Sequence, residues 1–263
     1  MQKLSFNIVL YLLFVLGCIS CKPSSNKMKQ LKLTQPNIVL ILADDLGYGD
    51  LSCYGSKRIN TPNIDKMAAE GLKFTQFYAG SAVCTPTRVS ILTGQYPLRF
   101  NVSAHFNDQE MFLDNDVLTI PKVLKNEGYT SMHIGKWHLG GLNETHVLDR
   151  NNSMPGPLQH GFDHYLAMLE DPMYRGAAMR EKRLYKDAGK NLVKDDALLA
   201  PNNKHWTTIK FEEATKFIEN SANEKKPFFL NLWLDAPHAP YESSEKGVMD
   251  QYNDRAKGED LLY

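Results

Sequence analysis

The run Ile38-Val39-Leu40-Ile41-Leu42-Ala43 constrains the fold of this chain more than any other stretch. It contains only β-branched residues, leucine and alanine, so both of its faces are apolar. A run of this kind is typical of a central strand in a parallel sheet, which is covered on both sides. Because parallel strands need long crossover connections, we expect helices between this strand and the next.

Helical and strand patterns alternate along the rest of the chain. The order β–α–β predicts an α/β fold with a mostly parallel central sheet flanked by helices. Residues 141–201 show no clear pattern, and we interpret the charged run Arg180–Arg183 within them as a solvated face. Helices are predicted at Thr61–Gly71, with Ile64, Met67 and Ala68 facing inward, and at Thr119–Gly128 and Thr208–Glu219; strands are predicted at Leu72–Tyr78, Tyr129–Ile134 and Phe228–Leu234.

A pair of carboxylates, Asp44 and Asp45, follows the first apolar run. In open α/β sheets, ligands bind beyond the carboxyl ends of the strands. Adjacent carboxylates repel each other unless a cation neutralises them, and oxygen ligands suit Ca²⁺ or Mg²⁺. Taken alone, however, the pair is better explained as two loop carboxylates, one of which caps a turn.

Cys84 stands at the predicted start of a helix, because Pro86 suits the first turn and Gly94 can end the helix in a left-handed conformation. Free backbone N–H groups and the positive end of the helix dipole would meet this cysteine, and Arg88 lies one turn further on. Such a place can bind and attack an anion. The alternatives are a buried small hydrophobe or a disulfide with Cys53.

Two further polar clusters follow predicted strands. Lys136 and His138 are two residues apart, so in an extended segment their side chains would point the same way and contact one anion together. His238 lies between two prolines, which stiffen its backbone. The alternative for all three is an ordinary surface lysine and histidines that are satisfied within loops.

Four motifs in these clusters resemble those of the sulfatase family. They are C-x-P-x-R at Cys84–Arg88, followed by Leu92-Thr93-Gly94; the segment Asp44–Leu51; G-K-W-H-x-G at Gly135–Gly140; and P-H-x-P at Pro237–Pro240. Thr87 stands where most members have serine and keeps the hydroxyl group. The resemblance extends from Pro36 to about Tyr241, and its elements occur in the family order.

The resemblance implies an alkaline phosphatase-like fold and hydrolysis of a sulfate ester, on a carbohydrate or another small molecule. It implies that a maturation enzyme oxidises Cys84 to formylglycine, whose hydrate is the nucleophile. It also implies Ca²⁺, rather than Mg²⁺, bound by Asp44, Asp45 and residue 84. The resemblance also implies roles for the other site residues. Arg88 would stabilise the hydrate, Lys136 and His138 would hold the nucleophile and the sulfate, and His238 would donate a proton towards the leaving oxygen.

Two other functions stay open beside this one. The first is hydrolysis of phosphodiesters or phosphonate monoesters by the same superfamily, and the second is glycan binding without catalysis. The family's second pair of metal ligands, and a lysine near the leaving group, have no match in this chain. We therefore expect 36–263 to be an incomplete catalytic domain, and residues 1–263 alone to bind metal weakly and turn over little or no substrate.

Residues 1–21 are typical of an export signal, with Lys3 before an apolar stretch that is too short for a stable membrane anchor. Val15-Leu16-Gly17-Cys18 resembles a bacterial lipobox, which predicts lipidation at Cys18, with Cys21 as the second candidate. Residues 22–35 would form a polar tether. We expect an exported lipoprotein of the bacterial periplasm or outer membrane, and the formal net charge of zero gives no case for binding nucleic acid.

Overall fold

The computed structural model describes residues 35–106, 111–143, 147, 154–169, 191–201 and 203–238. The predicted export signal with Cys18 and Cys21, nearly all of the predicted tether and the charged run Arg180–Arg183 lie outside the described residues. Within the described part of the chain, no helix is both long enough and apolar enough to cross a membrane.

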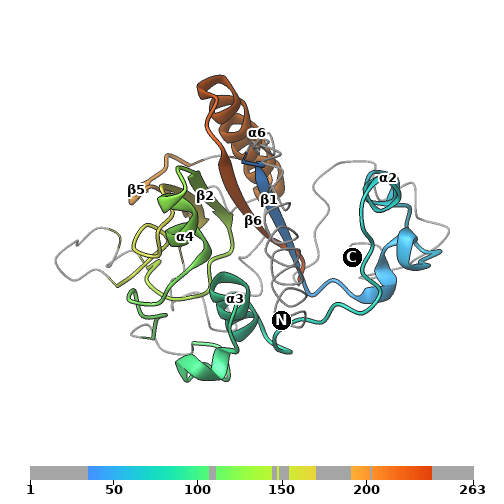
Figure 1. Ribbon diagram of the computed structural model, residues 1–263, viewed down its shortest axis with the longest axis horizontal. Helices are drawn as coiled ribbons and strands as arrows, with labels where there is room; N and C mark the ends of the chain where they lie inside the picture. The colour runs from blue at the N-terminus through green and yellow to red at the C-terminus, as the bar shows by residue number, and fades with distance from the viewer. Residues whose placement is uncertain are drawn as a thin grey trace, which may run out of the picture. The chain divides into compact units, whose positions relative to one another are not determined.

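A six-stranded sheet with the strand order β1-β6-β2-β3-β4-β5 organises the described residues (Figure 1). The first four strands in this order are mutually parallel, and β4 and β5 continue the sheet in antiparallel fashion. The predicted α/β class with a mostly parallel sheet is therefore confirmed. The strands are β1 (Ile38–Asp44), β2 (Thr130–Gly135), β3 (His164–Met168), β4 (Leu192–Lys194), β5 (Ala197–Leu198) and β6 (Phe228–Pro237).

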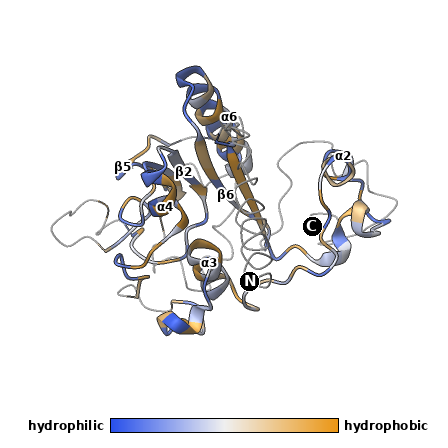
Figure 2. Ribbon diagram, in the orientation of Figure 1, coloured by the Kyte–Doolittle hydropathy of each residue, from blue (hydrophilic) through white to orange (hydrophobic). Residues whose placement is uncertain are grey.

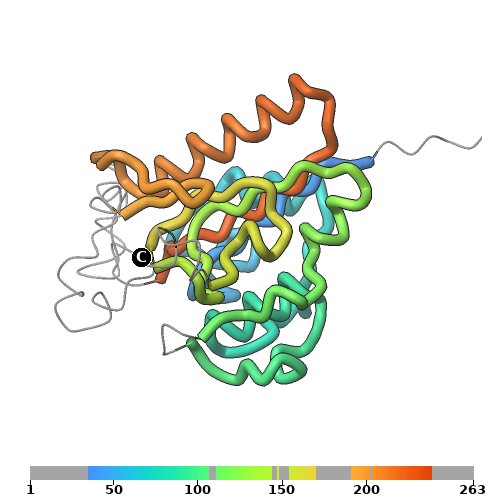
Figure 3. Tube along the Cα trace, turned by 90° about the vertical axis from the view of Figure 1, so that its left-hand side faces the viewer, coloured from blue at the N-terminus to red at the C-terminus, as the bar shows by residue number. Residues whose placement is uncertain are grey.

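Helices lie on both sides of this sheet, as the turned view shows for α3 and α6 (Figure 3). Helix α6 packs on the face to which Met132 and Ile134 of β2 point, while the alternate residue His133 points to the face of α3. The helices are α2 (Pro62–Glu70), α3 (Cys84–Thr93), α4 (Ile120–Asn126) and α6 (Trp206–Glu224), with short 3₁₀ turns η1 (Tyr48–Asp50), η2 (Ser52–Tyr54) and η3 (Pro97–Phe100).

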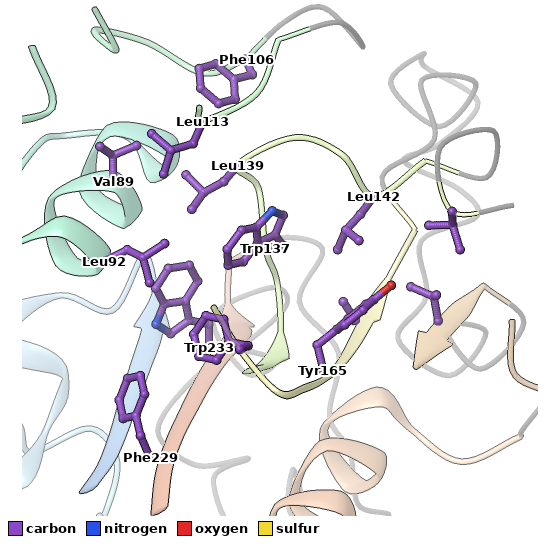
Figure 4. Packing of buried hydrophobic residues seen from close by; sticks show 14 of the residues in the cluster. Val89, Leu92, Phe106, Leu113, Trp137, Leu139, Leu142, Tyr165, Phe229 and Trp233 are labelled. Carbon is purple, nitrogen blue, oxygen red and sulfur yellow. The ribbon is translucent and has the colours of Figure 1, made fainter. Parts of the chain in front are cut away.

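A core of aromatic and aliphatic side chains fills the layer between the sheet and α3 (Figure 4). Trp137 and Trp233 stack with their ring centroids 6.1 Å apart, and both are almost completely buried. Val89 and Leu92, on the inner side of α3, belong to the same core. Burial of this apolar surface fixes α3 against the sheet and so fixes the position of Cys84 at its first residue.

The strand β1 is not central, which corrects the prediction from its sequence. Among the described strands it lies at the end of the order and pairs only with β6. Its side chains alternate in exposure, and Val39 and Ile41 remain about half exposed, at 46% and 52%. A run that is apolar on both faces predicts a strand correctly, but it does not tell which neighbours cover the second face.

Two smaller predictions, for the inner face of 61–71 and for a strand at 72–78, are also wrong. Helix α2 has the predicted limits, beginning after Thr61 and ending before Gly71, but none of its residues is buried. Its expected inner-face residues Ile64 and Met67 are exposed at 41% and 68%. Residues 72–78 form no strand, since none of them pairs with a described strand, and Figure 2 shows apolar residues in this exposed part.

Candidate active site

The ends of the parallel strands bring the predicted polar residues to one edge of the sheet. Asp44 is the last residue of β1 and is 6% exposed. Asp45 follows with a φ of 62°, so the chain turns here and the side chain of Asp45 is 63% exposed. Lys136 comes directly after β2 and His238 directly after β6, as expected for parallel strands.

Asp44 is the centre of the charged contacts at this edge. Its Oδ2 lies 2.5 Å from Lys136 Nζ, and its Oδ1 lies 3.3 Å from Arg88 Nη2. Burial acts to raise the pKa of Asp44, but the two cations outweigh burial and hold this pKa below its ordinary value. Asp44 is therefore ionised at neutral pH, and it neutralises one of the two cations beside it.

Cys84 contacts this group from the first residue of α3. Its Sγ lies 3.4 Å from Asp44 Oδ1 and 3.5 Å from Lys136 Nζ. Burial is the main cause that raises the pKa of the Cys84 thiol, with Asp44 acting in the same direction and Lys136 against it. Among the described residues, Cys53 and Cys84 are both free, so the alternative of a disulfide between them is wrong.

Arg88 holds α3 to the sheet. Its side chain is 1% exposed, it donates from Nη1 to the carbonyl oxygen of Lys136 at 2.9 Å, and its guanidinium lies 4.9 Å from the ring centroid of Trp233. A second tie comes from Thr85, whose Oγ1 donates to the carbonyl oxygen of His138 at 2.9 Å. Both contacts fix the first turn of α3 against the segment after β2.

Gly135 allows that segment to pass close to β6. It has a φ of 109°, and a Cβ atom at this position would lie 1.8 Å from the carbonyl oxygen of Trp233. The next residue, Lys136, donates its backbone N–H to the same oxygen at 3.1 Å. Only glycine meets both demands, which explains why glycine precedes the lysine that reaches Asp44.

His138 reaches the site by a different route from the predicted one. Its φ is 56°, so the segment from Lys136 to His138 is not extended, yet one ring nitrogen still lies within 4.8 Å of Cys84 Sγ. Burial, followed by the charges of Lys136 and Arg88, lowers the pKa of His138 to about 2. The ring is therefore neutral at physiological pH and can donate one N–H to an anion.

The loop after β6 places His238 beside the carboxylate pair. Its Nε2 lies 3.7 Å from Asp45 Oδ2, and its side chain is 37% exposed. The structure thus brings together all seven predicted residues, namely Asp44, Asp45, Cys84, Arg88, Lys136, His138 and His238. Their chemical roles stay predictions, as does lipidation of Cys18.

His105 belongs to the same group, although the motifs did not indicate it. Its ring stacks on that of His138, with centroids 5.1 Å apart and planes inclined by 16°. One of its ring nitrogens also lies within 4.8 Å of Cys84 Sγ. No local pattern in the sequence marks His105; the next residue, Phe106, is buried in the core beside α3.

The carboxylates and position 84 have the donor chemistry that a hard cation needs. One oxygen of Asp44, one of Asp45 and the Sγ of Cys84 lie within 4.8 Å of one another. Carboxylate oxygens suit Ca²⁺, and an oxygen in place of the sulfur would complete an all-oxygen set. These residues therefore fit the implied calcium, which would compete with Lys136 for Asp44.

The edge of this α/β sheet thus gathers a cysteine at the start of a helix, a carboxylate pair and the two cations Arg88 and Lys136, an arrangement that suits an anionic ligand. The sulfatase family model matches residues 36–259, and the chain belongs to the sulfatase family.

Sequence relatives and solved structures agree with this family. The chain is 37% identical to human N-acetylgalactosamine-6-sulfatase over 232 residues, covering 80% of this chain and 41% of that protein. It is 42% identical to human arylsulfatase H over 139 residues, covering 50% and 24%. The structure of Ps i-CgsB in complex with k-i-k-neocarrahexaose superposes with a TM-score of 0.71 and 28% identity, covering 88% of this chain and 51% of that chain. The chain thus spans less than half the length of the curated relatives it matches.

Proposed function

We propose that this protein hydrolyses a sulfate ester, with residue 84 as the nucleophile. The observation that carries the proposal is the arrangement around Cys84 Sγ, which has Asp44 at 3.4 Å and Lys136 at 3.5 Å and lies at the first residue of α3. Cations and helix N–H groups at this place favour an anionic, tetrahedral group such as a sulfate ester. The names of the sequence relatives, which are sulfatases, support the same reaction.

Cys84 would act after oxidation to formylglycine by a maturation enzyme. The hydrated aldehyde offers one hydroxyl that attacks sulfur and a second whose deprotonation expels sulfate and restores the aldehyde. In balance, the S–O bond to the alcohol breaks, one water is consumed, and the products are the free alcohol, sulfate and a proton. A serine or an unmodified thiol lacks the second hydroxyl and could not release sulfate in this way.

The chain's own residues would hold and polarise the reacting groups. Arg88 is buried, and its guanidinium is held between Asp44 and the carbonyl oxygen of Lys136, so its fork of donors stays fixed beside the site. Lys136 can turn from Asp44 to a sulfate oxygen, because its side chain is 18% exposed and therefore not locked in the core. His138 is neutral and can donate an N–H to another oxygen.

Protonation of the leaving oxygen would fall to His238. It lies beside Asp45 and is partly open to solvent, with its side chain 37% exposed. The carboxylate of Asp45 at 3.7 Å can orient the ring. Asp44 and Asp45 would hold Ca²⁺, in preference to Mg²⁺, and the ion would make both the nucleophile more acidic and the sulfur more electrophilic.

A sulfated glycan is the substrate class that the relatives' names support. One relative is named for N-acetylgalactosamine 6-sulfate, and the structure of BT4656, at 29% identity and a TM-score of 0.63, holds D-glucosamine-2-N,6-O-disulfate. We further propose that the protein is exported and tethered to a bacterial membrane by a lipid on Cys18, where it would meet such polysaccharides.

The test is turnover by the full-length gene product, co-expressed with a formylglycine-generating enzyme and supplied with Ca²⁺. We expect release of sulfate from an aryl sulfate and from sulfated sugars, and loss of this release in Cys84→Ala. A phosphodiester and a phosphonate monoester serve as parallel substrates. Faster turnover of either phosphorus ester would overturn the proposal, and so would a full-length parent protein that binds a sulfated glycan, with and without Cys84→Ala, and releases no sulfate from it.

A further inference from the structure

A second group of metal-ligating side chains meets at Cys84, separate from the carboxylate pair. Among the described residues, Cys84 Sγ and one ring nitrogen each of His105 and His138 lie within 4.8 Å of one another. The carboxylates form their own group with Cys84 and do not join this one. Cys84 therefore stands between an oxygen-rich set of ligands and a set of two imidazoles.

The two sets differ in the metal that they prefer. A thiolate with two imidazoles is a soft to borderline ligand set, which favours Zn²⁺ over Ca²⁺. Around a tetrahedral zinc ion, the Zn–S and Zn–N lengths of about 2.3 and 2.0 Å place these ligand atoms roughly 3.3–3.6 Å apart. Since the three atoms lie within 4.8 Å of one another, they would close in by at most about 1.5 Å on binding. The stacked rings of His105 and His138 can make this movement together, since they already face the same way to within 16°.

Access and charge also permit a cation at this place. All three ligand residues are half-buried rather than sealed in the core, so a hydrated ion can reach them. The nearby cations Lys136 and Arg88 are both in contact with the ionised Asp44, which reduces their repulsion of a further cation. Asp45 adds a second negative charge at the same edge of the sheet.

We infer that the chain whose Cys84 is still a thiol binds one Zn²⁺ through Cys84, His105 and His138, with the fourth position left to water. Binding releases the thiol proton to solvent and forms a Zn–S bond. Oxidation of Cys84 to an aldehyde removes the sulfur and with it the site. Zinc therefore binds the chain in which Cys84 is a thiol and not the chain in which it has been oxidised to the aldehyde. Until that oxidation, the bound ion occupies the sulfur. This inference requires only that Cys84 is a thiol, so its test does not depend on whether the protein hydrolyses sulfate esters.

The experiment uses the full chain with unconverted Cys84, stripped of metal with a chelator and titrated with Co²⁺ as a spectroscopic probe for Zn²⁺. We expect a thiolate-to-cobalt charge-transfer band that saturates at one equivalent and disappears when Zn²⁺ is added. Cys84→Ser should abolish the band. His105→Ala and His138→Ala should each weaken Zn²⁺ binding by at least about tenfold. Even the loss of a residue that only hydrogen-bonds to a metal ligand weakens metal binding by this factor.

Matched controls separate this site from others. Cys53→Ser, His164→Ala and Asp45→Ala should keep the band, because none of these residues supplies a ligand to it. Circular dichroism checks that each variant is folded, and His105→Gln replaces His105→Ala if the latter does not fold. The inference is overturned if the folded chain gives no thiolate band, if His105 variants bind Zn²⁺ as tightly as the parent, or if Asp45→Ala removes binding.

Discussion

Replacing Asp44 by asparagine tests the charge arrangement on which the site is built. The substitution keeps the shape of the side chain but leaves Arg88, which is 1% exposed, without its ionised partner. Removing one member of a buried ion pair costs roughly 3–5 kcal/mol, because the remaining charge stays desolvated. The contact with Lys136 adds less, about 1 kcal/mol or below, since that side chain is 18% exposed and water can replace the carboxylate.

We therefore expect Asp44→Asn to lower the free energy of unfolding by about 3–5 kcal/mol at neutral pH. The assay is urea unfolding in the presence of a chelator, so that bound metal does not contribute. The double variant Asp44→Asn, Arg88→Met should recover part of the loss, because it removes the buried cation together with its partner. A loss below about 1 kcal/mol, or strictly additive losses in the double variant, would refute the reasoning.

Acidification gives the same pair a second signature. The pKa of Asp44 in the folded chain lies below its ordinary value of 3.8. Its stabilising contribution is therefore complete above that value and disappears as the pH falls below it, towards the folded-state pKa. Asp44→Asn should lack this acid-dependent loss, whereas the parent chain should show it.

Three further predictions concern the backbone, the core and the thiol. Gly135→Ala should lower the free energy of unfolding by at least about 3 kcal/mol, because the φ of Gly135 is 109° and the added Cβ would collide with the backbone of Trp233. The control Gly49→Ala should cost below about 1 kcal/mol, since no atom lies within 4 Å of the added Cβ. Thermal unfolding of the two variants compares these costs. Burial lowers the pKa of His133 from 6.5 to about 3, so this residue costs no stability above pH 6.5, and the free energy of unfolding falls by about 1.4 kcal/mol per pH unit below it. His133→Asn should reduce the slope of stability against pH by the equivalent of about one bound proton. An unchanged slope would show that His133 does not cause it. Alkylation of Cys84 by iodoacetamide should be slow at neutral pH and accelerate as the pH rises, because burial raises the pKa of the thiol; fast labelling at neutral pH, followed by peptide mass, would contradict this.

Much of the site could be predicted because its residues stand at the ends of strands. The parallel strand β1 ends in Asp44, and β2 and β6 are directly followed by Lys136 and His238; parallel pairing brings these ends to one edge. The limits of α3 were also predictable, since Gly94 ends it with a φ of 68°. In each case the controlling interaction is local or follows from the direction of the chain.

The residues that prediction missed depend on contacts between distant segments. His105 reaches Cys84 through a loop without regular structure, and its stacking on His138 has no sequence signal. The strands β3 and β4 were missed because they are short and lie in a stretch of mixed composition. The edge position of β1 could not be predicted either, because hydropathy reports that a face is apolar but not which segment covers it.

The mass of the peptide that contains Cys84, taken from the protein as its native host makes it, tests the central claim most directly. The account predicts an aldehyde at this position, so the peptide should be lighter than the cysteine form and should react with a hydrazide. An unmodified thiol in protein that releases sulfate at full rate, or a disulfide to Cys53, would contradict it.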